Sequence, residues 1–378
     1  GMVAAKYRGR VITKAEFAPK REETPDSADE YDGLREANAD AGDDELLDWE
    51  TMRIIVQKDG LALEGMPMCL RRDPSMVAEA VKQNPWAIRC AASEFHGDRM
   101  LALGAVQRDG LVLQHLSEEL RDDGELCNEA VLQNGLALQF VSERLRRDGD
   151  LVLEAMRQNW RAIDHASEEL FGEYDFIAEA VNISWRAMAY ATVDLCGERE
   201  LILSAARQNP TALAHAQHFL CADRALIAEA IGASWQALQY ASKTLRDDRE
   251  LVAAAIAQSG LALQSASEVL RADRDVVLSA VRGNGMALEF AADHLRNDRD
   301  VVLEAIRRDR NALQYASEAL RGEAAFVLEA IAIDGLVVEH ASEELRGSLD
   351  VMQEAVRQDW RAVEYATPAI REDSSLNA

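Results

Sequence analysis

Apolar residues recur with a period of twenty-five from residue 46 to residue 370, without insertion or deletion. This interval holds thirteen repeats, and we number the positions of each from 1 to 25. Most repeats are apolar at positions 6, 7, 10 and 11, and again at positions 17, 18, 21 and 25. Spacings of three and four place such side chains on one stripe of a helix, whereas a strand would alternate them. Each repeat therefore predicts two short helices.

Polar residues at fixed positions mark where these helices begin. Position 3 is Asp or Glu in twelve repeats, and position 14 is Asn, Asp or Ser in all thirteen. Short polar side chains of this kind accept hydrogen bonds from the first N–H groups of a helix. We therefore expect one helix at about positions 4–13 and a second at about positions 15–24. Arginine is frequent at position 1, where a cation suits the negative end of the second helix.

Helices of about ten residues are not stable alone in water, because nucleation is costly and the apolar stripe stays exposed. Stacking successive repeats buries the stripes and gives an α-solenoid in which each repeat contacts its neighbours. Alanine dominates positions 10, 17 and 21 and allows helix axes to approach to about 8 Å. The predicted fold is all-α: a solenoid of thirteen 25-residue helix-turn-helix repeats over residues 46–370. We expect it to be superhelical, with the second helices on the concave side.

The two ends of the chain lack the repeat. Residues 1–21 carry six Lys or Arg against Glu16 alone, and residues 22–45 are strongly acidic. Such segregated charge is typical of a disordered or tethered tail. The alternative interpretation of this N-terminal arm, residues 1–45, is a basic hook that folds onto the acidic repeats. Residues 371–378 form a polar C-terminal tail.

One repeat shows a known sequence pattern. Residues 300–306 read D-V-V-L-E-A-I and residues 311–318 read N-A-L-Q-Y-A-S-E. This string resembles the uncharacterised DUF4116 family, whose repeat reads D-x-x-V-V-L-x-A-V-x-x-N-G-x-A-L-x-Y-A-S-x-x-L. The resemblance extends over nearly all of residues 46–370. It implies helical repeats and supplies no activity, cofactor or catalytic residue.

Composition narrows the function classes. The net charge is −26, with 67 acidic and 41 basic residues, so the chain would repel a phosphate backbone and we expect no nucleic-acid partner. No stretch of eighteen residues is apolar, which argues against a membrane partner. Five cysteines without a Cys-x-x-Cys pair favour reduced thiols and a cytoplasmic location. Cys196 and Cys221 lie one repeat apart, about 10 Å, which exceeds disulfide reach.

Candidate chemistry is sparse. Between residues 115 and 240, position 20 alternates histidine with an aromatic residue, but alternate repeats lie about 20 Å apart and cannot share one metal ion. His215 and His218 are the only close pair. A metal protein or enzyme centred on them is the less favoured alternative. There is no glycine-rich phosphate loop, no G-x-S-x-G and no H-E-x-x-H. We therefore predict no catalytic residue, no metal, no cofactor and no enzymatic activity.

Position 15 offers the most informative irregularity. Where it is Gly, position 16 is apolar, and where it is Trp, position 16 is Arg or Gln. Packing compensation is one interpretation. The other is a binding surface, because aromatic anchors are typical of binding hot spots. The candidate binding residues, which come from repeats 5–8, are Trp160, Trp185, Trp235, Tyr190, Tyr240, His165, His215 and Phe171.

The predicted function is a non-catalytic scaffold that binds a protein or peptide along the solenoid surface. The negative charge suits a basic partner. The main alternative is a structural spacer whose ends carry the interactions.

Overall fold

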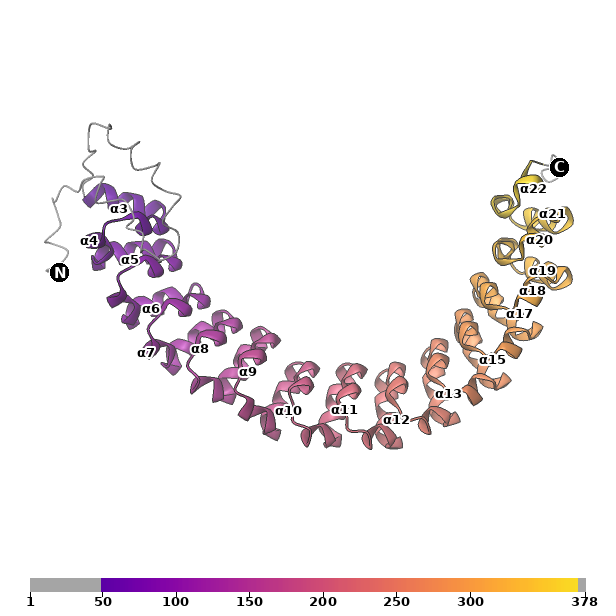
Figure 1. The fold of residues 1–378 in the computed structure, drawn as a ribbon, viewed down its shortest axis with the longest axis horizontal. Coiled ribbons are helices and arrows are strands. Elements are labelled where there is room, and N and C mark those ends of the chain that lie inside the picture. The colour runs from indigo at the N-terminus through magenta and orange to yellow at the C-terminus, as the bar shows by residue number, and fades with distance from the viewer. Residues whose placement is uncertain (1–48, 373–378) are drawn as a thin grey trace, which may run out of the picture. The chain divides into compact units, whose positions relative to one another are not determined.

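The computed structural model describes residues 49–372 (Figure 1). Every element in this range is helical. The chain divides into two compact units, Gly1–Ile183 and Ser184–Ala378, which we describe separately. The N-terminal arm, residues 1–45, and all but two residues of the predicted C-terminal tail lie outside the described range, so the predicted domain boundaries and the superhelix stay predictions.

In the first compact unit, five of the repeats open with a regular α-helix followed by a 3-10 helix and then a short turn of helix. The long helices are α3 (Trp49–Lys58), α5 (Pro74–Gln83), α6 (Arg99–Val106), α8 (Gly124–Gln133), α9 (Gly149–Gln158) and α10 (Tyr174–Ile183). The 3-10 helices are η2 (Gly60–Gly65), η3 (Pro85–Cys90), η5 (Gly110–His115), η6 (Gly135–Phe140) and η8 (Trp160–His165). The short helices are α4 (Met68–Arg71), η4 (Ser93–Gly97), α7 (Glu118–Arg121), η7 (Leu145–Arg147) and η9 (Glu168–Gly172).

The second compact unit has the same order of elements. Each of its long helices packs beside the next long helix along the chain (Figure 1). The long helices are α11 (Arg199–Gln208), α12 (Arg224–Ala233), α13 (Arg249–Gln258), α15 (Arg274–Gly283), α17 (Arg299–Arg308), α19 (Ala324–Ile331) and α21 (Leu349–Gln358). The 3-10 helices are η10 (Trp185–Ala189), η12 (Pro210–His215), η14 (Trp235–Tyr240), η16 (Gly260–Ser265), η17 (Gly285–Phe290), η18 (Arg310–Tyr315), η19 (Gly335–His340) and η20 (Trp360–Tyr365). The short helices are η11 (Leu195–Gly197), η13 (Leu220–Ala222), η15 (Leu245–Asp247), α14 (Glu268–Arg271), α16 (Asp293–Arg296), α18 (Glu318–Arg321), α20 (Glu343–Arg346) and α22 (Pro368–Arg371).

The prediction of one continuous second helix over positions 15–24 is wrong. A 3-10 helix spans positions 15–20, the backbone then opens, and a separate short helix follows. The new helix starts near position 22, which is Ser in many repeats. Ser117 has an extended backbone with φ −63° and ψ 159°, and its Oγ accepts a hydrogen bond from the N–H of Leu120. A serine in this role caps a new helix instead of continuing the old one.

The predicted caps at positions 3 and 14 are confirmed. Asp248 accepts hydrogen bonds from the N–H groups of Glu250 and Leu251 at 3.0 and 3.2 Å, and α13 begins there. Asn134 accepts from the N–H of Leu136 at 3.0 Å, and η6 begins there. Most repeats thus carry the signal for both of their longer helices in their own sequence. The exceptions, whose side chains make no cap bond, are Ser184, Glu198, Ser234, Glu323 and Ser348.

Main-chain hydrogen bonds join one short helix to the next. The N–H at position 22 donates to the carbonyl at position 1 of the same repeat, which closes the preceding short helix. Ser142 donates to Arg121 at 2.8 Å in the first compact unit, and Ser317 donates to Arg296 at 2.9 Å in the second. The bond recurs with Ala292 as donor, so it does not depend on the side chain.

The long helices and the 3-10 helices enclose the core of each compact unit. Alanines at position 10, among them Ala130, Ala155 and Ala280, are fully buried. Glycine at position 15 packs directly against the next repeat: a Cβ on Gly260 would lie 2.2 Å from the carbonyl oxygen of Ala280. Consecutive repeats therefore approach main chain to main chain at this point.

Candidate binding surface

Five of the predicted site residues lie on neighbouring 3-10 helices of the second compact unit. Trp185 begins η10, His215 ends η12, and Trp235 and Tyr240 begin and end η14. Tyr190 directly follows η10. Helix η12 contacts both η10 and η14, and all five side chains are half-buried. The structure therefore brings these five residues together on adjacent elements.

The two tryptophans of this group are held through their main chains. The N–H of Trp185 donates to Oε1 of Gln208 at 3.0 Å, and that of Trp235 donates to Oε1 of Gln258 at 2.9 Å. Both glutamines belong to the following repeat. The indole N–H of each tryptophan bonds to no described residue. The rings are thus anchored at one end and keep a polar edge for another molecule.

The remaining three predicted residues belong to the first compact unit. Trp160 and His165 begin and end η8, Phe171 lies in η9, and all three are half-buried. The guanidinium of Arg161 lies 5.5 Å from the centre of the Trp160 ring, a cation–π arrangement. Arg186 covers Trp185 in the same way at 4.8 Å. Arg161 and Arg186 therefore each cover part of the tryptophan that precedes them.

The exchange of Gly-Leu for Trp-Arg at positions 15 and 16 also has a packing component. Leu61 and Leu111, which follow glycines, are half-buried, whereas Arg161 and Arg186 are exposed. In the last repeat, Trp360 stands at the same position and is 71 % exposed. Trp86, at position 16, instead donates its indole N–H to Asp109 at 2.7 Å. The tryptophans of the chain thus occupy different environments, and those in repeats 5, 6 and 8 share position 15 and half-burial.

The histidines at position 20 pack between repeats. The His115 ring meets the Trp86 ring edge-on at 5.6 Å, and Nε2 of His340 lies 3.4 Å from Oδ1 of Asn311. Burial lowers the pKa of both imidazoles below 6.5. Within residues 49–372, no three His, Cys, Asp or Glu side chains are placed to hold a metal ion. The His215 and His218 alternative therefore has no third ligand in that range.

These lowered pKa values predict how stability depends on pH. Neutral imidazoles are favoured in the folded state, so the unfolded chain binds more protons below about pH 6.5. Stability should therefore fall as the pH decreases through 6.5 and level off below the folded pKa values. The melting temperature of a His115→Gln/His340→Gln protein should change less than that of the parent between about pH 7.5 and 5.5. If the melting temperatures of the two proteins changed equally over this pH range, His115 and His340 would not be the source of the pH dependence.

The five cysteines are free thiols. Burial raises the pKa of Cys127 to about 12, and its Sγ donates to the carbonyl of Arg121 at 3.3 Å. Burial also raises the pKa of Cys196 and Cys221. A thiol that resists ionisation is a poor nucleophile.

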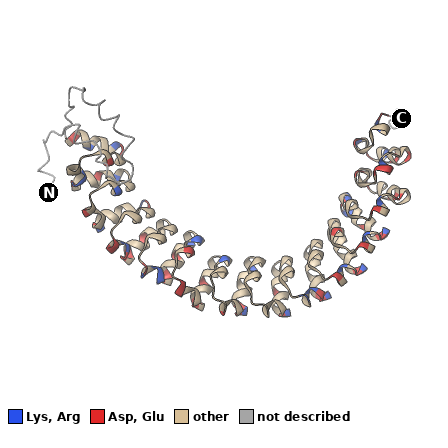
Figure 2. Cartoon of the chain, viewed as in Figure 1, with Lys and Arg blue, Asp and Glu red and all other residues tan. Residues whose placement is uncertain are grey.

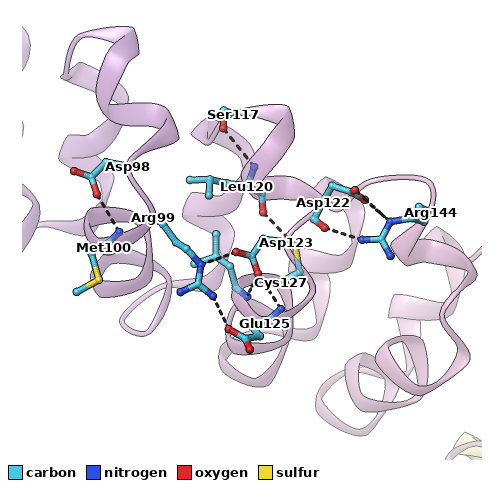
Figure 3. Close-up of polar contacts among 11 residues, drawn as sticks. Asp98, Arg99, Met100, Ser117, Leu120, Asp122, Asp123, Glu125, Cys127 and Arg144 are labelled. Atoms are coloured by element: carbon cyan, nitrogen blue, oxygen red, sulfur yellow. Dashed lines mark hydrogen bonds and ion pairs between the residues drawn. The ribbon is translucent and has the colours of Figure 1, made fainter.

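Ion pairs connect successive repeats along the starts of the long helices. The guanidinium of Arg99, at position 4, lies 2.7 Å from Asp123 and 2.6 Å from Glu125 of the following repeat (Figure 3). Arg224 makes the same pair of contacts with Asp248 and Glu250. Each arginine lowers the pKa of the cap carboxylate that it contacts, Asp123 or Asp248. Acidic and basic residues consequently lie close together along the repeats (Figure 2).

This arrangement of ion pairs is interrupted at two successive repeats, which were not recognised from the sequence. Position 4 is glycine at Gly124 and Gly149, and the acids of the following repeats line a groove of about 1000 Å³ between α8, α9 and α10. The available signal was the exchange of Arg for Gly at a position that pairs with position 3 of the next repeat. Only the structure shows that these two positions face each other.

The fold and surface define an all-α helical-repeat protein, and no helix within residues 49–372 combines the length and the apolar character that crossing a membrane requires. The chain belongs to the family described as Domain of unknown function (DUF4116), which matches residues 48–96, 98–137, 123–171, 223–271, 273–321 and 326–371. The predicted family resemblance is therefore confirmed. No curated protein and no solved structure matches the chain.

Proposed function

We propose that the protein is a non-catalytic scaffold that binds a protein or peptide through the aromatic residues of repeats 5–8. The observation that carries this proposal is the group of half-buried aromatic rings on η10, η12 and η14. Half-buried Trp and Tyr bind at low entropic cost, because little side-chain freedom remains to be lost. The unbonded indole N–H groups of Trp185 and Trp235 add polar specificity.

Charge supports a partner with basic character. The chain carries a net charge of −26, with 67 acidic and 41 basic residues. A negative surface attracts a basic partner from a distance and accelerates association. Aromatic anchoring then supplies the short-range part of the binding energy.

Substitution of Trp160, Trp185 and Trp235 by alanine should abolish capture of specific partners from a cell lysate, as measured by affinity capture and mass spectrometry. Helicity should stay unchanged in circular dichroism, because these rings are only half-buried. The matched control is Trp360→Ala, which removes the same side chain from the same repeat position at a distant site. Partners retained by the triple variant, or lost equally from the control, would remove this surface from consideration.

A further inference from the structure

A groove lies between α8, α9 and α10 of the first compact unit. Its volume is about 1000 Å³, and its floor includes the buried ring of Phe176 together with Leu132, which is 42 % exposed. Six carboxylates line it: Asp148, Asp150, Glu154, Glu173, Asp175 and Glu179. The one basic residue in the lining, Arg157, pairs with Glu154 at 2.6 Å. The other five acids form no ion pair with any residue of the described range.

The repeat shows what these carboxylates are suited to bind. They occupy positions 3, 5 and 9 of two successive repeats, and elsewhere in the chain the same positions hold a guanidinium. Arg274 contacts Asp298 and Asp300 at positions 3 and 5, each at 3.0 Å. Arg299 contacts Glu323 and Glu329 at positions 3 and 9, at 2.6 and 3.0 Å. Positions 3, 5 and 9 together are therefore an arginine-binding set in this protein.

In the groove, the arginine is missing from two successive repeats. Gly124 stands where an arginine would reach Asp148, Asp150 and Glu154, and Gly149 stands where one would reach Glu173, Asp175 and Glu179. The absence of both side chains opens the groove and leaves two sets of carboxylates one repeat apart. Two guanidinium or ammonium groups about 10 Å apart would match them.

We propose that this groove binds arginine and lysine side chains of the chain's own N-terminal segment, residues 1–21. That segment carries Lys6, Arg8, Arg10, Lys14, Lys20 and Arg21 with Glu16 as its one acid. Its charge is therefore complementary to that of the groove. Arg8 and Arg10 are two residues apart, and in an extended peptide such residues point to one side about 7 Å apart. This spacing lets the two guanidinium groups reach neighbouring carboxylate sets.

The length of the intervening chain permits this contact. Residues 22–48 precede the first described residue, Trp49, and twenty-seven residues can span up to about 90 Å. Helix α8 lies three repeats beyond α3, which corresponds to about 30 Å at a spacing of about 10 Å per repeat. The inference concerns the long helices, so it does not depend on the aromatic residues of the 3-10 helices.

Zero-length carbodiimide coupling of the full chain tests the proposal. The reagent joins a lysine ammonium to a carboxylate that touches it, and mass spectrometry of the digest identifies the pair. Lys6, Lys14 and Lys20 should couple to Asp150, Asp175 and Glu179 in preference to the exposed acids Glu343, Glu344 and Asp350 of the second compact unit. The products should be monomeric. Coupling without this preference, or found only in crosslinked dimers, would overturn the proposal.

Three variants that test the proposal keep every lysine and every groove carboxylate. Gly124→Arg supplies the missing guanidinium from within, and its Cβ would lie 3.9 Å from Leu145, an ordinary contact. It should lower coupling to Asp150, which belongs to the carboxylate set that this arginine would fill, about tenfold. Gly232→Arg is the matched control, because a Cβ there meets nothing within 4 Å, and coupling should be unchanged. An Arg8→Gln/Arg10→Gln protein, whose repeats are unaltered, should also lose coupling. Coupling to Asp150 that survives either groove-directed change, or that falls equally in the Gly232→Arg control, would refute the assignment.

Discussion

A Gly260→Ala protein should be less stable than the parent by roughly 1–3 kcal/mol, the usual cost of overpacking. The added Cβ would lie 2.2 Å from the carbonyl oxygen of Ala280 and 3.0 Å from the main-chain nitrogen of Asn284. Neither group is the flexible end of a side chain, so η16 and α15 would have to move apart. Chemical denaturation followed by circular dichroism measures the effect.

The same substitution at Gly232 serves as the control. Gly232 lies on the exposed side of α12, and a Cβ there meets no atom within 4 Å. Alanine in a helix interior is favoured over glycine, so Gly232→Ala should increase stability by about 0.5–1 kcal/mol. If Gly260→Ala and Gly232→Ala both raised the stability, or both lowered it, the proposed role of the position-15 glycine would be contradicted.

A Phe326→Ala protein should lose about 3–5 kcal/mol of stability, because the ring of Phe326 is fully buried in α19 and its removal leaves a cavity. Phe219→Ala is the matched control: this ring is 58 % exposed, and the change should stay within about 0.5 kcal/mol. Each repeat contacts mainly its neighbours, so faster hydrogen exchange should be concentrated in α19 and in the adjoining α17 and α21. A uniform increase throughout the second compact unit would contradict this local response.

Local signals explain what the sequence predicted well. The caps at Asp248 and Asn134 act on N–H groups two or three residues away, and such contacts can be recognised from spacing alone. The break of the second helix was also encoded locally, by Ser117 followed by Glu118 and Glu119, a pattern typical of a helix start. It was missed because the apolar residues at positions 21 and 25 fit the spacing of one continuous helix.

The candidate surface could be predicted only in part. The position of Trp185 and Trp235 at the start of their helices follows from the cap residue before them. The placement of Trp160 in the other compact unit does not, because the sequence carries no sign of a division near Ile183. The acidic groove required knowledge of which positions face each other across repeats. The contact between Arg99 and Asp123 joins residues twenty-four apart, and the consequence of Gly124 becomes visible only beside it.

The junction between short helices bears on how such a chain can change in length. Ser142 and Ser317 donate main-chain hydrogen bonds to the preceding short helices, and Ala292 does so without a hydroxyl. Duplicating or deleting a whole repeat would bring an equivalent donor opposite an equivalent acceptor, whatever the side chains. A change of any other length would leave one of these groups without its counterpart. Gene rearrangements in whole multiples of the period are therefore the least costly way to lengthen or shorten this protein.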